Sequence, residues 1–442
     1  MLNKQSHSGN KAIQYTFDQA MEKFNPAPGC NDVNEYGSLR AEEALDLALN
    51  RLTPVRGLES IPLHAAAGRV LAENIVSGAD VPAHTNSAVD GYAIRCRDFS
   101  SAENGRQIKV IDTALAGRPA RSVLRPMTAI RIMTGAILPH GADTVLMQEH
   151  VEIAPGTIRI HSKYKPGENI RAAGEDMKKG ESVLSAGRLC SPADVGLLAS
   201  LGFGELKVRR PVRVGVISTG SEVKRIGTPL EEGGVFDSNR YTLHAALRQP
   251  GVDVSDYGIV PDDKARLDEA MAAAQNDNDL VISTGGVSVG EADHTRTILA
   301  KRGEVLFSKV AIKPGRPLTF AILGSTSFFG LPGNPVAVMV TFYQFVWPAL
   351  RKLMGITPAG RLLTVKARSM NRIGKKPGRT EYQRGILELD ESGRWTVRST
   401  GRQGSGILRS MSLANGFIVL PHDAESIEAG EEVTVQPFEA FR

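Results

Sequence analysis

The alternation of apolar and polar positions divides the chain into segments of different character. Residues 1–37 are polar, contain several turn-forming residues and show no sustained periodicity, so we interpret them as a flexible leader. From Ser38, the apolar spacing predicts a helix over LRAEEALDLALNRL, with Ser38 as its N-cap. A second helix-like pattern follows in IPLHAAAGRVLAENIV.

Short strands are predicted next, because apolar runs alternate with turn residues in GYAIRC, QIKVID, AIRIM, DTVLMQEHVEI and TIRIHS. Helical spacing returns in SPADVGLLASLG, before the basic link KVRRPVR. We therefore expect a mostly β insertion domain at 79–171. It would interrupt one discontinuous, elongated helical linker domain formed by 38–78 and 172–210.

From Val212 onward, apolar strands alternate with amphipathic helices and end in a long helix, PVAVMVTFYQFVWPALRKLMG. This alternation predicts a parallel sheet covered by helices, and hence a three-layer α/β domain at 211–360. Strand-like patterns return after Gly360 and predict a small, β-barrel-like domain at 361–442. The fold class is thus multidomain α/β plus β.

Composition narrows the class of protein. The chain has 442 residues, enough for three or four compact units, and is 41% hydrophobic and 23% charged, as in soluble globular proteins. It contains no long apolar run and no signal-peptide core. Its three cysteines are far apart and form no CxxC, which fits a reducing cytoplasm and disfavours zinc. A net charge of +5 permits an anionic ligand without implying nucleic acid.

Two loops rich in small residues each follow a predicted strand: STGSE and STGGVSVGEADH. Each fits either an ordinary helix start or a loop whose backbone N–H groups bind an oxyanion. Because ligands of such sheets lie beyond the C-terminal strand ends, both loops would meet at one rim, together with Asp262 of a third loop. Mg²⁺ is usually bound where carboxylates lie beside phosphate oxygens. The candidates are Ser218, Thr219, Gly220 and Glu222 in the first loop, and Gly285, Gly286, Ser288 and Asp293 in the second.

Basic residues follow the two loops. Lys309 and Lys313 stand four apart in one predicted strand, so they would face the same side, either as solvated lysines or as anion ligands. LPGNP starts the long helix, and helix-start chemistry accounts for it. In the terminal domain, Glu381 is the single acid in the basic stretch RLLTVKARSMNRIGKKPGRTEYQR, which is either a solvated face or a surface for an anion. Ser405, between glycines, would add backbone donors.

The insertion contributes NSAVDGYAIR, RIMTGAILPHGADTVLMQE and a GED triplet at 174–176. Turn chemistry alone explains these motifs.

Taken in this order, STGSE, SxGGVSxGxxD, KPGRP and LPGNP resemble the molybdopterin-binding domain of molybdenum-cofactor biosynthesis proteins. With the insertion motifs and the terminal domain, residues 38 to the end resemble MoeA, the E domain of gephyrin and the plant equivalents. STGSE has Ser221 where many relatives have Asp, which removes one potential metal contact.

The resemblance implies a molybdopterin molybdenumtransferase that inserts molybdate into adenylylated molybdopterin and releases AMP with Mg²⁺. It further implies a cytoplasmic homodimer with a cleft shared between subunits, and contact with the adenylylating enzyme of the pathway. No membrane or nucleic-acid partner is expected. Carried over by position, the catalytic residues are Asp90, Thr134, Asp176, Glu222, Asp262 and Asp293; Mg²⁺ would bind Asp293 and Glu222; Lys309, Lys313, Arg384 and Ser405 would bind the anions. An adenylyltransferase and a non-enzymatic scaffold are the alternatives.

Overall fold

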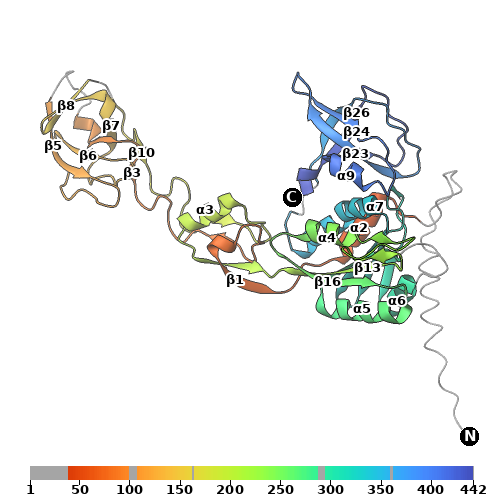
Figure 1. Cartoon of the computed structure of the whole chain (residues 1–442). Helices are drawn as coiled ribbons and strands as arrows, with labels where there is room; N and C mark the ends of the chain where they lie inside the picture. The colour runs from red at the N-terminus through yellow and green to blue at the C-terminus, as the bar shows by residue number, and fades with distance from the viewer. Residues whose placement is uncertain (1–37, 99–106, 162–163, 287–293, 359–361, 442) are drawn as a thin grey trace, which may run out of the picture. The chain divides into compact units, whose positions relative to one another are not determined.

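The computed structural model describes residues 38–98, 107–161, 164–286, 294–358 and 362–441 (Figure 1). The chain divides into two compact units. The larger contains the residues up to 57 and 210–442, and the smaller contains 58–209. Within the described ranges, no helix is both long and apolar enough to cross a membrane.

A six-stranded sheet forms the centre of the larger unit. Its strands, in spatial order, are β16 (Val252–Val260), β13 (Val212–Thr219), β17 (Leu280–Thr284), β21 (Thr326–Leu331), β20 (Thr319–Leu323) and β18 (Glu304–Phe307). The first four are parallel, whereas β20 and β18 run antiparallel to their neighbours. The α/β class is confirmed, but the expectation of a wholly parallel sheet is wrong at this edge. The reason is a two-residue turn after Leu323, which joins β20 directly to β21 through Gly324 at φ +64°.

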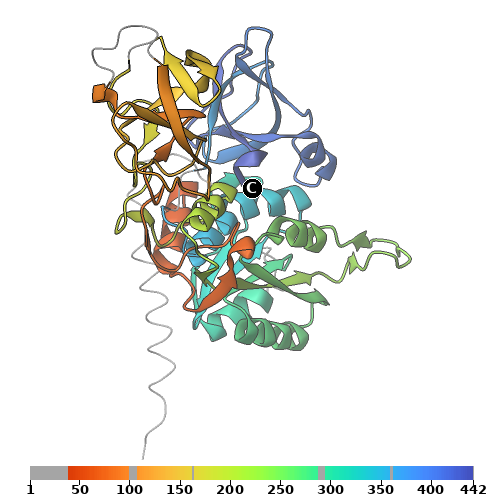
Figure 2. The same ribbon diagram turned by 90° about the vertical axis from the view of Figure 1, so that its left-hand side faces the viewer.

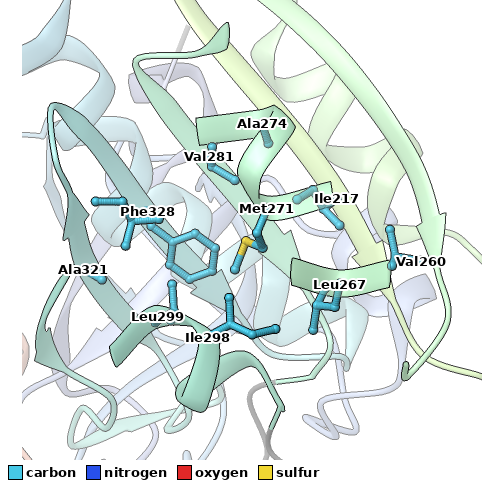
Figure 3. Packing of buried hydrophobic residues seen from close by; sticks show 11 residues of the cluster. Ile217, Val260, Leu267, Met271, Ala274, Val281, Ile298, Leu299, Ala321 and Phe328 are labelled. Atoms are coloured by element: carbon cyan, nitrogen blue, oxygen red, sulfur yellow. The ribbon is translucent and has the colours of Figure 1, made fainter. Parts of the chain in front are cut away.

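Helices cover both faces of this sheet (Figure 1). Helices α5 (Lys264–Asp277) and α6 (His294–Arg302) cover one face, and α4 (Asn239–Leu247) and α7 (Pro335–Thr341) cover the other. Figure 3 shows the core under α5 and α6, where Met271 and Ile298 lie beside Phe328 of the sheet. Burying a side chain of this size contributes roughly 1.5–3 kcal/mol to the free energy of folding. This packing stabilises the sheet whose strand ends carry the candidate loops.

The predicted long helix consists of three joined pieces. Helix α7 passes through a π-helical turn, Phe342–Val346, into α8 (Trp347–Leu353). The predicted first helix is present as α2 (Ala41–Arg51) and packs on α8. Its N-cap is Arg40 and not Ser38, because the Arg40 backbone N–H is the one that donates to the Glu43 carboxylate, at 3.0 Å.

The C-terminal part of the larger unit is a closed β-barrel, seen beside the α/β sheet in Figure 2 (blue). Its strands are β22 (Val365–Ser369), β23 (Thr380–Leu389), β24 (Trp395–Ser399), β25 (Gly416–Leu420) and β26 (Glu432–Pro437). Pairing between β23 and β25 closes the ring. A short strand from the α/β part, β19 (Ile312–Lys313), pairs in parallel with β23. Helix α9 (Leu408–Leu413) was not predicted.

The smaller unit contains the predicted β insertion. Its sheet has the order β7 (Thr144–Met147), β4 (Gly91–Ile94), β6 (Thr128–Ile132), β5 (Gln107–Ala114), β9 (Thr157–Ile160) and β8 (Val151–Ala154). The segments that flank the insertion share a second core, with Leu71 and Ile75 from one side and Leu198 and Val208 from the other. Helix α3 (Pro192–Ser200) begins at Ser191, whose hydroxyl accepts from the Asp194 N–H.

The second predicted helix, at 61–76, is wrong. The chain there forms β1 (Leu58–Pro62), a single 3₁₀ turn and β2 (Ile75–Val76). Strand β1 pairs with β12 (Glu205–Arg209), and Gly68 adopts a left-handed φ of +77° that interrupts any helix. Tertiary pairing thus outweighs the helix propensity of the alanine-rich sequence.

Candidate active site

Hydroxyl side chains line the neighbouring C-terminal ends of β13 and β17. Ser218 lies opposite Thr284 in the parallel register, and their buried hydroxyl oxygens are 3.3 Å apart. The Thr219 hydroxyl donates to the Thr284 carbonyl at 3.2 Å. These contacts hold the two strand ends together, so the two predicted loops do start side by side.

The turn after β17 requires glycine. Gly285 and Gly286 have φ of +81° and +64°. A Cβ on Gly285 would lie 2.3 Å from the Thr219 carbonyl oxygen, and one on Gly286 would lie 2.7 Å from the Thr219 hydroxyl. The backbone therefore approaches β13 more closely than any side chain would permit.

Two carboxylates accompany the STGSE loop. The Glu222 carboxylate folds back over Gly220, with its oxygens 2.8 and 2.9 Å from the position that a Cβ on Gly220 would take. The Asp262 carboxylate accepts the Ser221 backbone N–H at 3.1 Å. Both carboxylates are on exposed residues at the end of the sheet where the hydroxyls lie.

Ser288 and Asp293, the other candidates of the second loop, lie outside the described residues. Over the part of the chain that the structure describes, no cluster of three or more His, Cys, Asp or Glu side chains could hold a metal ion.

A pocket of about 380 Å³ opens between the α/β part and the barrel of the larger unit. The KPGRP segment, the LPGNP segment and the loop 403–405 supply most of its lining, and Arg379 is contributed by a fourth segment. Among the described residues, the lining includes the cations Lys313, Arg316 and Arg379 and the hydroxyl residue Ser405, and it contains no carboxylate. Such a lining favours a small anion.

The LPGNP segment connects this pocket to the glycine turn. The Gly285 N–H donates to the Leu331 carbonyl at 3.2 Å, and the Asn239 side-chain amide donates to the Gly333 carbonyl at 2.8 Å. Pro332 and Asn334 of the same segment line the pocket. The Val336 N–H donates to the Ser405 carbonyl at 3.1 Å, which also ties the barrel loop to the start of α7. The turn and the pocket are therefore adjacent parts of one site.

Arg384 lies behind the pocket and is fully buried. Its guanidinium donates to the Ser410 hydroxyl at 3.0 Å and to the Gly404 carbonyl at 3.1 Å. Burial lowers its pKa to about 10. A desolvated cation held by neutral acceptors attracts anions more strongly than a solvated one.

Lys309 and Lys313 do not share a strand, which corrects the expectation. Strand β18 ends at Phe307, and β19 contains only Ile312 and Lys313, because Val310 bridges to Leu39 in between. Lys313 lines the pocket, whereas Lys309 is not among its lining residues.

The remaining candidates, Asp90, Thr134 and Asp176, belong to the smaller unit. Asp90 accepts both the backbone N–H and the hydroxyl of Thr134, each at 2.7 Å. These hydrogen bonds lower the pKa of Asp90. Asp176 is exposed, and its backbone N–H donates to the Val81 carbonyl.

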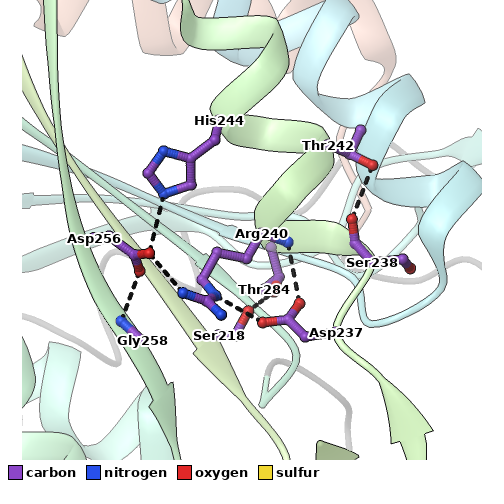
Figure 4. A network of polar contacts seen from close by, with 9 residues as sticks. All are labelled: Ser218, Asp237, Ser238, Arg240, Thr242, His244, Asp256, Gly258 and Thr284. Atoms are coloured by element: carbon purple, nitrogen blue, oxygen red, sulfur yellow. Dashed lines mark hydrogen bonds and ion pairs between the residues drawn. The ribbon is translucent and has the colours of Figure 1, made fainter. Parts of the chain in front are cut away.

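An ionic network at the start of α4, in which Arg240 and Asp237 are largely buried and Asp256 is exposed, does not follow from the sequence pattern (Figure 4). Arg240 binds Asp237 at 2.9 Å and Asp256 at 2.5 Å, and Asp256 also accepts the Gly258 N–H. Burial alone would lower the pKa of Arg240, but the two carboxylates raise it. The network anchors the turn that presents Asn239 to the LPGNP segment.

Pocket residues Arg316, Arg379 and Gln403 were also not singled out. The two arginines lie within KPGRP and KKPGRTE, so the repeated basic PGR sequence was the available signal. Gln403 carried no such signal: its amide is fixed by the Arg384 backbone and by Ser399, contacts that only the fold creates.

Three family models match the chain. They are "MoeA N-terminal region (domain I and II)" at 39–202, "Probable molybdopterin binding domain" at 215–352 and "MoeA C-terminal region (domain IV)" at 366–438.

Individual relatives match over most of their length. The molybdopterin molybdenumtransferase of Haemophilus influenzae is 42% identical over 401 residues, covering 90% of this chain and 98% of that protein. That of a Nostoc species is 37% identical over 391 residues, covering 87% and 90%. Among solved structures, the molybdopterin biosynthesis MoeA protein of Pyrococcus horikoshii matches with a TM-score of 0.79 at 34% identity, covering 90% of this chain and all of that one.

Proposed function

The chain belongs to the MoeA family, and we propose that it acts as a molybdopterin molybdenumtransferase, an enzyme of molybdenum-cofactor biosynthesis. In finer detail, we propose that its substrates are molybdate and adenylylated molybdopterin and that it releases AMP.

The cationic pocket is the observation that carries this proposal. Molybdate is a small tetrahedral dianion, and the described residues that line the pocket include Lys313, Arg316 and Arg379 but no carboxylate. Arg384 adds a buried positive charge behind it. Arginine and lysine donors of this kind bind oxyanions through charge-assisted hydrogen bonds.

The glycine turn supplies the neighbouring half of the site. Its close-packed backbone, held on β13 by the buried hydroxyls of Ser218 and Thr219, would form a floor for the pterin phosphate. Because LPGNP contacts both the turn and the pocket, the phosphate and molybdate would be held next to each other. Positioning two reactants in this way is itself a large part of catalysis.

The residues present fit Mg²⁺. The ion commonly takes only one or two protein carboxylates together with substrate phosphates, so the pair Glu222 and Asp262 suffices without a larger cluster. Asp293, from the second loop, is proposed as a further ligand on the resemblance alone. When bound, Mg²⁺ would neutralise the charge that develops on phosphate oxygens as the phosphoanhydride breaks. The Ser221 N–H donates to the Asp262 carboxylate and so holds it beside the STGSE loop.

We further propose a cytoplasmic homodimer whose cleft includes Asp90, Thr134 and Asp176 from the partner's smaller unit. The Asp90–Thr134 hydrogen bonds lower the pKa of that carboxylate and so favour its charged form, which is the form that would contact a cation or a proton donor. We also propose contact with the adenylylating enzyme, which would deliver the adenylylated substrate directly. Mixing Asp90→Ala subunits with Asp262→Ala subunits tests the shared cleft: partial recovery supports it, and none contradicts it.

The function is tested by incubating the protein with adenylylated molybdopterin, molybdate and Mg²⁺ while AMP is measured. We expect AMP release that depends on molybdate. Adenylylation of free molybdopterin by ATP would instead indicate an adenylyltransferase, and the absence of both reactions would indicate a scaffold.

A further inference from the structure

A buried carboxylate stands directly behind the pocket lysine. The Lys313 ammonium is 3.2 Å from a carboxylate oxygen of Glu381, and the Glu381 side chain is only 5% exposed, against 56% for Lys313. Glu381 is the lone acid of the basic stretch noted in the sequence. It does not line the pocket, so its role is exerted through the lysine.

The Glu381 carboxylate is itself fixed on its other side. The Gln383 side-chain amide donates to the second oxygen of Glu381 at 3.0 Å and to the Gly374 carbonyl at 3.1 Å. The backbone adds to this, because Lys313 and Glu381 are register partners between β19 and β23. Strand β19 of the α/β part thus carries Lys313, and strand β23 of the barrel carries Glu381, which holds the lysine in place.

The surrounding charges explain why a carboxylate is placed here. Lys375 is buried nearby and donates to the carbonyls of Lys376, His422 and Ala424. Burial lowers the pKa of Lys375, Lys313 lowers it further, and Glu381 opposes both. Without the carboxylate, the two ammonium groups would repel each other, and the long lysine side chain would leave the pocket for solvent.

We propose that Glu381 is a positioning residue that holds the Lys313 ammonium at the pocket, so that the site is ready for a tetrahedral oxyanion before the anion arrives. This inference rests on the proposed function, since it takes molybdate as the anion. Pre-organisation of this kind spares the cost of ordering a flexible lysine during binding.

The test is equilibrium dialysis of the full-length protein with molybdate alone, which does not depend on turnover. Glu381→Gln keeps the size of the side chain and removes its charge. We expect its dissociation constant for molybdate to rise roughly five- to tenfold, the scale of one partly exposed charge-assisted hydrogen bond. Glu388→Gln is the matched control, since Glu388 lies on the same strand but pairs with Arg398 on the surface, and should bind as the wild type does.

A double-mutant cycle separates positioning from a general effect on folding. In a Lys313→Ala background, Glu381→Gln should change molybdate binding little, because the group that it positions is gone. If Glu381→Gln weakened molybdate binding equally in both backgrounds, the proposal would be overturned. Tighter molybdate binding by Glu381→Gln would also overturn it, because the Glu381 charge would then only repel the anion. If wild-type protein binds molybdate yet releases no AMP, the proposed function fails while the positioning role is still decided by the cycle.

Discussion

Substituting Gly285 by alanine tests the close approach of the glycine turn to β13. Two costs are expected. Alanine at φ +81° costs about 1–2 kcal/mol, as for any left-handed non-glycine residue. Its Cβ would also lie 2.3 Å from the Thr219 carbonyl oxygen, which is backbone within a buried strand and cannot rotate away. Forcing such an overpacked contact costs about 1–3 kcal/mol more, for a total of about 2–5 kcal/mol.

Gly324→Ala is the matched control for this experiment. Gly324 also has a positive φ, +64°, but a Cβ there would meet nothing closer than the Gln275 amide nitrogen at 3.8 Å. Urea unfolding of both variants therefore isolates the steric cost, since the left-handed cost is common to both. We expect Gly285→Ala to lose at least about 1 kcal/mol more than the control. Equal losses would refute the packing argument and, with it, the glycine floor of the site.

Three further predictions follow from named contacts. Asp279→Asn removes the bidentate ion pair with Arg210, in which both contacts are 2.7 Å, and should cost about 2 kcal/mol of unfolding free energy. Burial alone would raise the pKa of Asp279, but Arg210 and the Arg213 N–H lower it overall. The stabilisation by the Arg210–Asp279 pair is therefore present above the unfolded pKa of about 4 and is lost as the pH falls through the lower folded pKa. If wild type and variant still differed as much in unfolding free energy in strong acid, this reasoning would be wrong. Thr134→Val should raise the pKa of Asp90, measured by NMR titration, because one of the two Thr134 hydrogen bonds that lower it is lost; an unmoved titration would count against it. Glu222→Gln should raise the Mg²⁺ concentration needed for half-maximal AMP release by roughly tenfold or more, and an unchanged requirement would exclude Glu222 as a metal ligand.

Sequence patterns located the parts of the fold that depend on local signals. The strand at 280–284 begins with three apolar residues, Leu280 to Ile282, and is followed by glycines, so both its existence and the edge at which its loop lies can be predicted from the pattern. The clustering of Ser218 with Thr284 is a direct consequence of parallel register. Local pattern wrongly predicts a helix at 61–76, because the strand that pairs with the start of this segment lies more than a hundred residues away in the sequence.

The pocket could be predicted only in part. KPGRP was recognised as basic, but the pairing of Lys313 with Glu381 depends on a β19 strand that leaves the α/β part to join the barrel. Likewise, no periodicity distinguishes the fully buried Arg384 from exposed arginines of the same stretch. Both features arise from contacts between segments far apart in sequence, which apolar periodicity does not encode.

The proposed function requires that molybdate binds in the pocket between KPGRP, LPGNP and 403–405. Anomalous X-ray scattering at the molybdenum edge, from crystals soaked in molybdate, tests it most directly. We expect a strong molybdenum peak in this pocket, near Lys313 and Ser405, and its loss in Lys313→Ala crystals. A wild-type crystal with molybdenum bound elsewhere and none in the pocket would contradict it.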